Sequence, residues 1–293
     1  HGPDGQPLAH RTLCVACAVN RTIPDLSDPV RAGQWGKIEL AKRRLVSALL
    51  AMGLPFRSKL DEDPARGVVF DFLADQPGGP RVLTGHDDGL ITLNVAEADD
   101  AVREKARAAM HEPYRTLLGH LRHEIGHYYW DRLVAASPWL EPFRALFGDE
   151  RADYGQALQR HYEQGAPADW PLHFISAYAT MHPWEDWAET WAHYLHINDT
   201  IATANDFGLA LAQTEDYQPF GPDVLYRTDV AGAGAFLDAV NDWVRLTGVM
   251  NELARSMGVN DLYPFVMSAE VVRKLHFIHL VVADARQAIG TAA

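Results

Sequence analysis

The feature that most constrains this chain is the sequence His-Glu-Ile-Gly-His at residues 123–127. The residues around it, from about 113 to 134, have the apolar periodicity of a helix. On such a helix His123 and His127 lie about 40° apart and one turn apart along the axis, so both imidazole rings can reach one cation. Glu124 lies about 100° from His123, where a general base can reach a metal-bound water without being a ligand.

The polar face of this helix continues beyond the motif. His120 and Asp131 extend it over three turns, while Leu121 and Ile125 lie on the opposite, apolar face. A surface helix would rarely carry three neutral histidines where lysine would serve. We therefore favour a metal site over the alternative, which is an ordinary solvated polar stripe.

A catalytic zinc site needs a third protein ligand and an open fourth position. Candidates occur on a second predicted helix that begins at Pro183, a residue suited to the first turn of a helix. Glu185 and Glu189 share one face of this helix, and tryptophans occupy the other. We assign Glu185 as the third ligand and Glu189 as the carboxylate that orients a ligand histidine. The exchanged assignment, and an exposed acidic stripe with no metal, remain as alternatives.

Two sequence segments together resemble a known family. Residues 178–189, Tyr-Ala-Thr-Met-His-Pro-Trp-Glu-Asp-Trp-Ala-Glu, with His-Glu-Ile-Gly-His-Tyr-Tyr-Trp upstream, are similar to a bacterial family of zinc-binding metallopeptidases of the zincin type. Members of that family carry a zinc ribbon ahead of the peptidase domain. More distantly, the helix with two glutamates four residues apart, and a tyrosine seven residues before the first, is similar to the peptidase domain of anthrax lethal factor. The resemblance extends from Cys14 to the last helix.

The resemblance implies a division of roles within the site. Zn²⁺ would be held by His123, His127 and Glu185, Glu124 would be the general base, and Tyr178 would stabilise the oxyanion. An ordinary core tyrosine is the alternative for Tyr178. We expect His120 and His182 to support the site from nearby, and either one as a fourth ligand would instead close a structural zinc site.

Further elements predict an α+β fold with a zincin-like order. A helix is predicted over 35–53, with Lys42 and Arg43 on its solvated face, and strands over 67–73, 81–84 and 90–95 are predicted to form a small antiparallel sheet. The helix that carries the motif follows, and the C-terminal half is mostly helical. One helix is expected between the two site helices and ends at residue 164. Three more are expected over 200–213, 232–258 and 268–289.

The domain organisation follows from the same comparison. Residues 1–30 are interpreted as a remnant of the N-terminal zinc ribbon and a linker, because Cys14 and Cys17 match the last cysteine pair of the family's ribbon. The other pair is missing, so these residues are either an incomplete ribbon or free thiols. Residues 31–293 form the predicted peptidase domain, with its sheet-containing part ending at about 135.

Composition excludes some classes of partner. The formal net charge of -13 argues against nucleic acid, because phosphate binding needs a basic surface. No apolar run approaches the length of a membrane span, so we expect no membrane segment. No secretory leader is visible and the chain has two cysteines, so a cytoplasmic location is the default expectation.

The sequence therefore predicts a zinc metallopeptidase that hydrolyses peptide bonds of a peptide or protein substrate. Two alternatives remain: a zinc-binding interaction protein without catalysis, and a metal-dependent amidase that acts on a non-peptide substrate. A protein partner of the incomplete ribbon is a further expectation.

Overall fold

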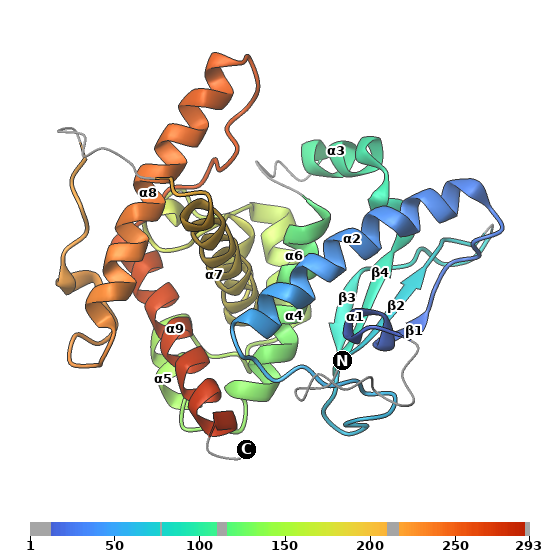
Figure 1. Ribbon diagram of the computed structural model, residues 1–293, viewed down its shortest axis with the longest axis horizontal. Helices are drawn as coiled ribbons and strands as arrows, with labels where there is room; N and C mark the ends of the chain where they lie inside the picture. Colours follow the sequence, from blue (N-terminus) through green and yellow to red (C-terminus); the bar gives the residue numbers. More distant parts are fainter. Residues whose placement is uncertain (1–12, 77, 110–115, 210–216, 291–293) are drawn as a thin grey trace. The chain divides into compact units, whose positions relative to one another are not determined.

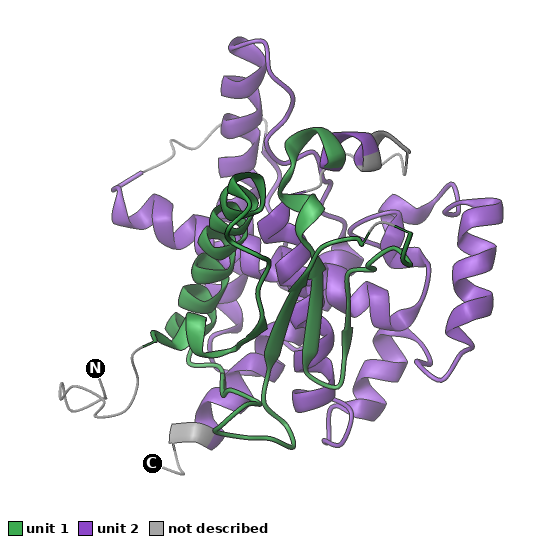
Figure 2. Ribbon diagram, turned by 90° about the vertical axis from the view of Figure 1, so that its right-hand side faces the viewer, with its two compact units in different colours: residues 1–102 green, residues 103–293 purple. Residues whose placement is uncertain are grey.

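A computed structural model describes residues 13–76, 78–109, 116–209 and 217–290 (Figure 1). The chain divides into two compact units, residues 1–102 and 103–293 (Figure 2). The fold is α+β, with one small sheet in the first unit and mostly helices in the second. No helix in the described ranges has the length and apolar character needed to cross a membrane.

The first unit is built around a four-stranded sheet in the order β1-β2-β4-β3. Its elements are α1 (Val15–Ala18), β1 (Asn20–Thr22), α2 (Pro29–Ala51), β2 (Val69–Leu73), β3 (Gly85–Asp87), β4 (Leu90–Asn94) and the 3-10 turn η1 (Val95–Ala98). The helix α3 (Asp100–Ala109) follows at the boundary between the units. The small sheet is as predicted, but its topology differs from the prediction.

The prediction of an antiparallel sheet of consecutive hairpins is wrong. β1 pairs with β2, and β2 with β4, in parallel, and only the β3–β4 pair is antiparallel. The predicted strand over 81–84 is not a strand, and β3 lies just after it. Asp88 and Gly89 join β3 to β4 with φ of 41° and 80°, as a tight two-residue hairpin turn requires.

The helix α2 packs on the sheet through aromatic side chains. It begins six residues earlier than predicted, because the carboxylate of Asp28 accepts a hydrogen bond from the Val30 amide and caps it. The rings of Trp35 and Phe72 meet edge to face at 5.0 Å. Lys42 is not solvated as predicted but fully buried, where it pairs with Glu39.

The second unit is a bundle of helices that carries the motif. Its elements are α4 (Leu117–Leu133), α5 (Leu140–Phe147), α6 (Tyr154–Gln164), η2 (Trp170–Leu172), η3 (Tyr178–Thr180), α7 (Pro183–Asp206), η4 (Pro222–Val224), α8 (Ala233–Ser256) and α9 (Ala269–Gly290). The motif helix is present, and the hydroxyl group of Thr116 caps it by accepting a hydrogen bond from the Gly119 amide. The start of the predicted range, 113–115, lies outside the described residues.

The second predicted helix begins at Pro183, as expected, but is longer. It is α7, which continues for 24 residues and includes the start of the separate helix predicted over 200–213. The end of that range lies outside the described residues. The helices predicted over 232–258 and 268–289 correspond to α8 and α9.

Candidate metal centre

The site forms where α4 and α7 approach each other closely. A Cβ atom on Gly126 would lie 3.1 Å from the Cα of Ala188 and 3.2 Å from a ring carbon of Trp191, so a larger residue would force its neighbours at this crossing to shift. The indole N–H of Trp187 donates a hydrogen bond of 2.9 Å to the carbonyl of Gly126. The rings of Tyr129 and Trp191 stack at 4.9 Å. This packing holds the histidines of one helix against the carboxylates of the other.

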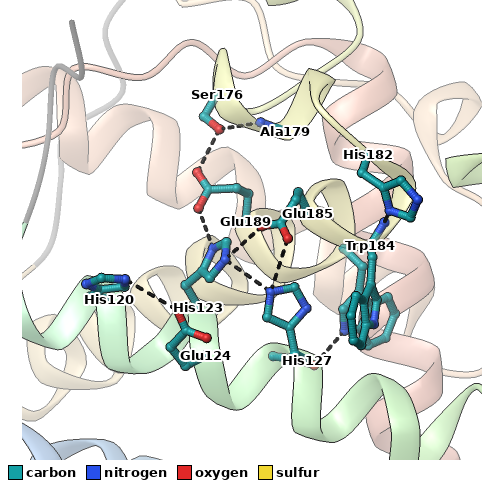
Figure 3. A network of polar contacts seen from close by, with 12 residues as sticks. His120, His123, Glu124, His127, Ser176, Ala179, His182, Trp184, Glu185 and Glu189 are labelled. Carbon is teal, nitrogen blue, oxygen red and sulfur yellow. Dashed lines mark hydrogen bonds and ion pairs between the residues drawn. The ribbon is translucent and has the colours of Figure 1, made fainter. Parts of the chain in front are cut away.

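The structure brings His123, His127 and Glu185 together (Figure 3). All three are buried, and their potential ligand atoms lie within 4.8 Å of one another. The Nε2 atoms of the two histidines are 3.2 Å apart. Glu185 places Oε2 3.0 Å from Nε2 of His123 and Oε1 3.5 Å from Nε2 of His127.

These separations match the ligand shell of a zinc ion. Zinc bonds of about 2.0–2.2 Å to nitrogen and oxygen in a tetrahedron put neighbouring ligand atoms roughly 3.4 Å apart. The three separations observed among His123, His127 and Glu185 are 3.0, 3.2 and 3.5 Å. Two imidazoles and one carboxylate are also a donor set typical of catalytic zinc. The residues present therefore fit this metal.

The electrostatics of the cluster favour a positive charge. Burial lowers the pKa of His123, but hydrogen bonds to Glu185 and Glu189 outweigh it and raise the pKa well above its usual range. Burial raises the pKa of Glu185, but the charges of His127 and His123 and its hydrogen bonds with them lower it well below its usual range. The carboxylates therefore stay ionised around a buried centre.

Glu124 flanks the cluster, as its helical position requires. Its Oε1 atom lies 3.3 Å from Nε2 of His120 (Figure 3). Burial raises the pKa of Glu124, but the hydrogen bond with His120 and the charge of His123 outweigh it, so the pKa is lower than usual. The structure thus keeps Glu124 ionised beside the site and outside the three-residue group.

Glu189 contacts the far side of the His123 ring. Its Oε1 atom lies 2.6 Å from Nδ1 of His123, and its Oε2 atom accepts a hydrogen bond of 2.6 Å from the hydroxyl group of Ser176. Ser176 also accepts a hydrogen bond from the Ala179 amide, at 3.1 Å. When Nδ1 of His123 donates to Glu189, Nε2 keeps its lone pair for a metal.

His182 lies close to the site but cannot be a ligand. Its Nδ1 atom accepts a hydrogen bond of 3.1 Å from the Trp184 amide and so caps α7, and its Nε2 atom lies 3.0 Å from the carbonyl oxygen of Ala152. Both ring nitrogens are therefore occupied by backbone groups. His182 supports the start of the helix that carries Glu185.

Two tyrosines lie over the cluster. The ring of Tyr178 is 6.0 Å from the ring of His123. The hydroxyl group of Tyr154 donates a hydrogen bond of 2.9 Å to Oε1 of Glu185. Sequence reasoning missed Tyr154, because directly after Asp153 it looks like an ordinary first residue of a helix.

Among the described residues, other histidine and cysteine pairs do not join a metal group. Cys14 and Cys17 are free thiols with sulfur atoms 3.4 Å apart. His276 is fully buried, and its Nδ1 atom accepts a hydrogen bond of 3.1 Å from the Tyr226 amide, so it packs in the core.

Comparisons with known proteins agree with this geometry. A family model described as "Putative zinc-binding metallo-peptidase" matches residues 31–281. Uncharacterised proteins of Mycobacterium bovis and of two strains of Mycobacterium tuberculosis are each 46% identical to this chain over 273 residues, which is 93% of this chain and 76% of each relative. No solved structure matches the chain. The match over residues 31–281 shows that the chain belongs to this family of zinc-binding metallopeptidases.

Proposed function

We propose that this chain is a zinc-dependent peptidase with a zincin-like site, in which His123, His127 and Glu185 hold the metal. The observation that carries the proposal is the meeting of these three buried side chains, with ligand atoms within 4.8 Å of one another. Membership of the metallopeptidase family supports the reaction class. When bound, zinc would polarise the scissile carbonyl and lower the pKa of a water molecule at the site.

Glu124 is the general base in this proposal. Its carboxylate is ionised beside the metal ligands, so it can take a proton from the attacking water and pass it to the leaving amine. His120 holds Oε1 of Glu124 at 3.3 Å and thereby orients the carboxylate. The helical offset of Glu124 from His123 keeps it out of the ligand shell.

Tyr178 is proposed to stabilise the oxyanion. Burial raises the pKa of its hydroxyl group above the usual value, so the phenol keeps its proton and can donate it in a hydrogen bond. The ring lies 6.0 Å from that of His123, beside the proposed metal ligands.

Glu189 is proposed to orient His123, and Glu185 to be the ligand. The contact of Glu189 with Nδ1, at 2.6 Å, supports this assignment over the exchanged one, because Glu189 touches the nitrogen that faces away from Glu185. The geometry also favours catalysis over a closed structural site. Among the described residues, His120 and His182 both lie outside the group that can share one metal ion.

The test combines metal analysis with a peptidase assay. The protein is loaded with zinc, and the hydrolysis of a peptide library is compared for the wild type and Glu124→Gln. We expect about one zinc ion per chain in both proteins and hydrolysis by the wild type alone. Loss of zinc from Glu124→Gln would make Glu124 a ligand, and equal hydrolysis by both proteins would remove it from the mechanism.

A further inference from the structure

The hydrogen bond between Tyr154 and Glu185 has no role in the mechanism described so far. Tyr154 is the first residue of α6, and Glu185 is in the first turn of α7. The bond therefore joins two helices at a member of the metal group. The Tyr154 hydroxyl group donates to Oε1 of Glu185 at 2.9 Å. Oε2 of the same carboxylate is buried and lies 3.0 Å from Nε2 of His123. One oxygen is thus held by a phenol while the other faces a proposed ligand histidine.

Contacts that do not involve the metal group hold the chain around Tyr154. Gly148 ends α5 with φ of 107°, and a Cβ atom there would lie 3.1 Å from the ring of Pro183, the first residue of α7. Arg144 holds the next residues, because its Nε atom donates to Oε2 of Glu150 at 2.9 Å. The loop from 148 to 153 is therefore packed against the start of the helix that carries Glu185.

His182 adds a second link between the same two segments. It reaches from the N-cap of α7 to the carbonyl oxygen of Ala152 at 3.0 Å. Its ring also meets the ring of Tyr154 edge to face at 5.3 Å. Tyr154 is thus in contact with the same residue that caps the Glu185 helix, which ties the phenol and the carboxylate to one packed segment.

We propose that Tyr154 is a positioning residue for the metal site: its hydroxyl group fixes the Glu185 carboxylate through Oε1 and leaves Oε2 directed at His123. This inference rests on the zinc-binding function proposed above. A metal ligand that is held in place before binding loses less conformational freedom when the metal arrives. Groups that hold ligands in this way typically contribute about 10- to 100-fold to metal affinity.

The two phenols of the site have separable roles. Tyr154 donates a hydrogen bond to the proposed ligand Glu185, whereas the ring of Tyr178 lies beside His123, 6.0 Å from its ring. Loss of the Tyr154 hydroxyl should weaken zinc binding, and loss of the Tyr178 hydroxyl should not.

The experiment measures the zinc dissociation constant of the full chain by competition with a chromophoric chelator. Tyr154→Phe removes the hydroxyl group and keeps the ring that packs on His182. Tyr178→Phe tests the other phenol. Tyr162→Phe is the matched control, because Tyr162 lies on the same helix and is 65% exposed. We expect a dissociation constant about 10-fold higher for Tyr154→Phe, and wild-type values for the other two variants.

Two further readouts separate positioning from a general loss of stability. The melting temperature of the metal-free protein should be the same for Tyr154→Phe and the wild type, since Tyr154 is 39% exposed. The visible absorption spectrum of the Co²⁺-loaded protein should change in Tyr154→Phe and not in Tyr162→Phe, because only the former alters a ligand.

The outcomes distinguish this inference from the proposed function. A wild type that binds no zinc overturns the proposed function itself. A wild type that binds zinc, with Tyr154→Phe binding it equally tightly, overturns the positioning role of Tyr154 and leaves the peptidase proposal intact. A metal-free Tyr154→Phe protein that melts much lower than the wild type would also overturn it, by making the role of Tyr154 structural.

Discussion

Oε1 of Glu189 lies 2.6 Å from Nδ1 of His123, while Oε2 of Glu185 lies 3.0 Å from Nε2 of the same ring. Two carboxylates from consecutive turns of α7 therefore contact the two ring nitrogens of one imidazole (Figure 3). The contact with Glu189 fixes which nitrogen carries the proton, and so leaves the other nitrogen for a metal. The two glutamates should consequently differ in how much each contributes to zinc affinity.

Replacing each glutamate by alanine tests this difference. We expect Glu185→Ala to abolish tight zinc binding, because it removes a ligand. Glu189→Ala should weaken binding about 10- to 100-fold, because it removes only the group that orients His123. Zinc affinity measured by chelator competition gives the ranking. The opposite ranking would exchange the roles of the two residues.

The close approach of α4 and α7 predicts a steric effect at Gly126. Gly126→Ala would place a Cβ atom 3.1 Å from the Cα of Ala188, and backbone atoms cannot move aside easily. We expect a loss of about 1–3 kcal/mol in the free energy of unfolding. Gly248→Ala in α8 is the control, because no atom lies within 4 Å of the added Cβ, and it should stabilise by about 0.5–1 kcal/mol. Urea unfolding of both variants measures the effect, and a neutral Gly126→Ala would show that the helices are not packed this tightly.

A buried ion pair holds the start of α7 to α9. Nζ of Lys274 lies 2.7 Å from Oδ2 of Asp186, and both side chains are almost fully buried. Lys274→Met leaves Asp186 buried without its cation, so we expect a loss of about 3–5 kcal/mol in the free energy of unfolding. The exposed pair of Arg227 and Asp229 is the control, and Arg227→Met should cost less than about 1 kcal/mol. Similar losses in the two variants would contradict a special role for the buried pair.

The two histidines of the metal group could be predicted because helical geometry places them on one face of α4. His123 and His127 are one turn apart on any helix, and Pro183 correctly marks the start of the helix that carries Glu185. Tyr154 could not be predicted in the same way. It reaches Glu185 through a loop whose path depends on Gly148 and His182, and spacing along the chain does not encode that path.

In the sheet, local sequence signals indicate a turn but not the pairing of the strands. The pair Asp88-Gly89 is a strong local signal for a hairpin turn, and it lies between β3 and β4. β2 and β4 pair in parallel because the chain between them crosses back to the other end of the sheet. The alternation of apolar and polar residues within the strands does not reveal the direction of this connection. β1 has only three residues, too few for a recognisable alternation of apolar and polar residues.

The core histidine His276 predicts a dependence of stability on pH. Burial, with a smaller effect of His279, lowers the pKa of His276 to about 4, whereas an unfolded histidine has a pKa of about 6.5. Between these values the unfolded chain binds the proton and the folded chain does not, so the free energy of unfolding should fall as the pH drops from about 6.5 to about 4.

His276→Asn tests this dependence. Asparagine has no titrating group but can still accept the hydrogen bond from the Tyr226 amide. Urea unfolding at several pH values gives the free energy of unfolding as a function of pH. This free energy should fall less steeply towards low pH in the variant than in the wild type, and the difference should correspond to at most one proton taken up on unfolding. His173→Asn is the control, because that side chain is 49% exposed. An unchanged slope in His276→Asn would show that His276 does not contribute to acid unfolding.

The central claim is tested most directly by locating the metal itself. A crystal of the zinc-loaded protein, measured on both sides of the zinc absorption edge, gives an anomalous difference map that identifies the ion. We predict one strong peak bonded to His123, His127 and Glu185, with a remaining coordination position that no side chain fills. A peak at another site, or a fourth protein ligand that closes the shell, would contradict the account.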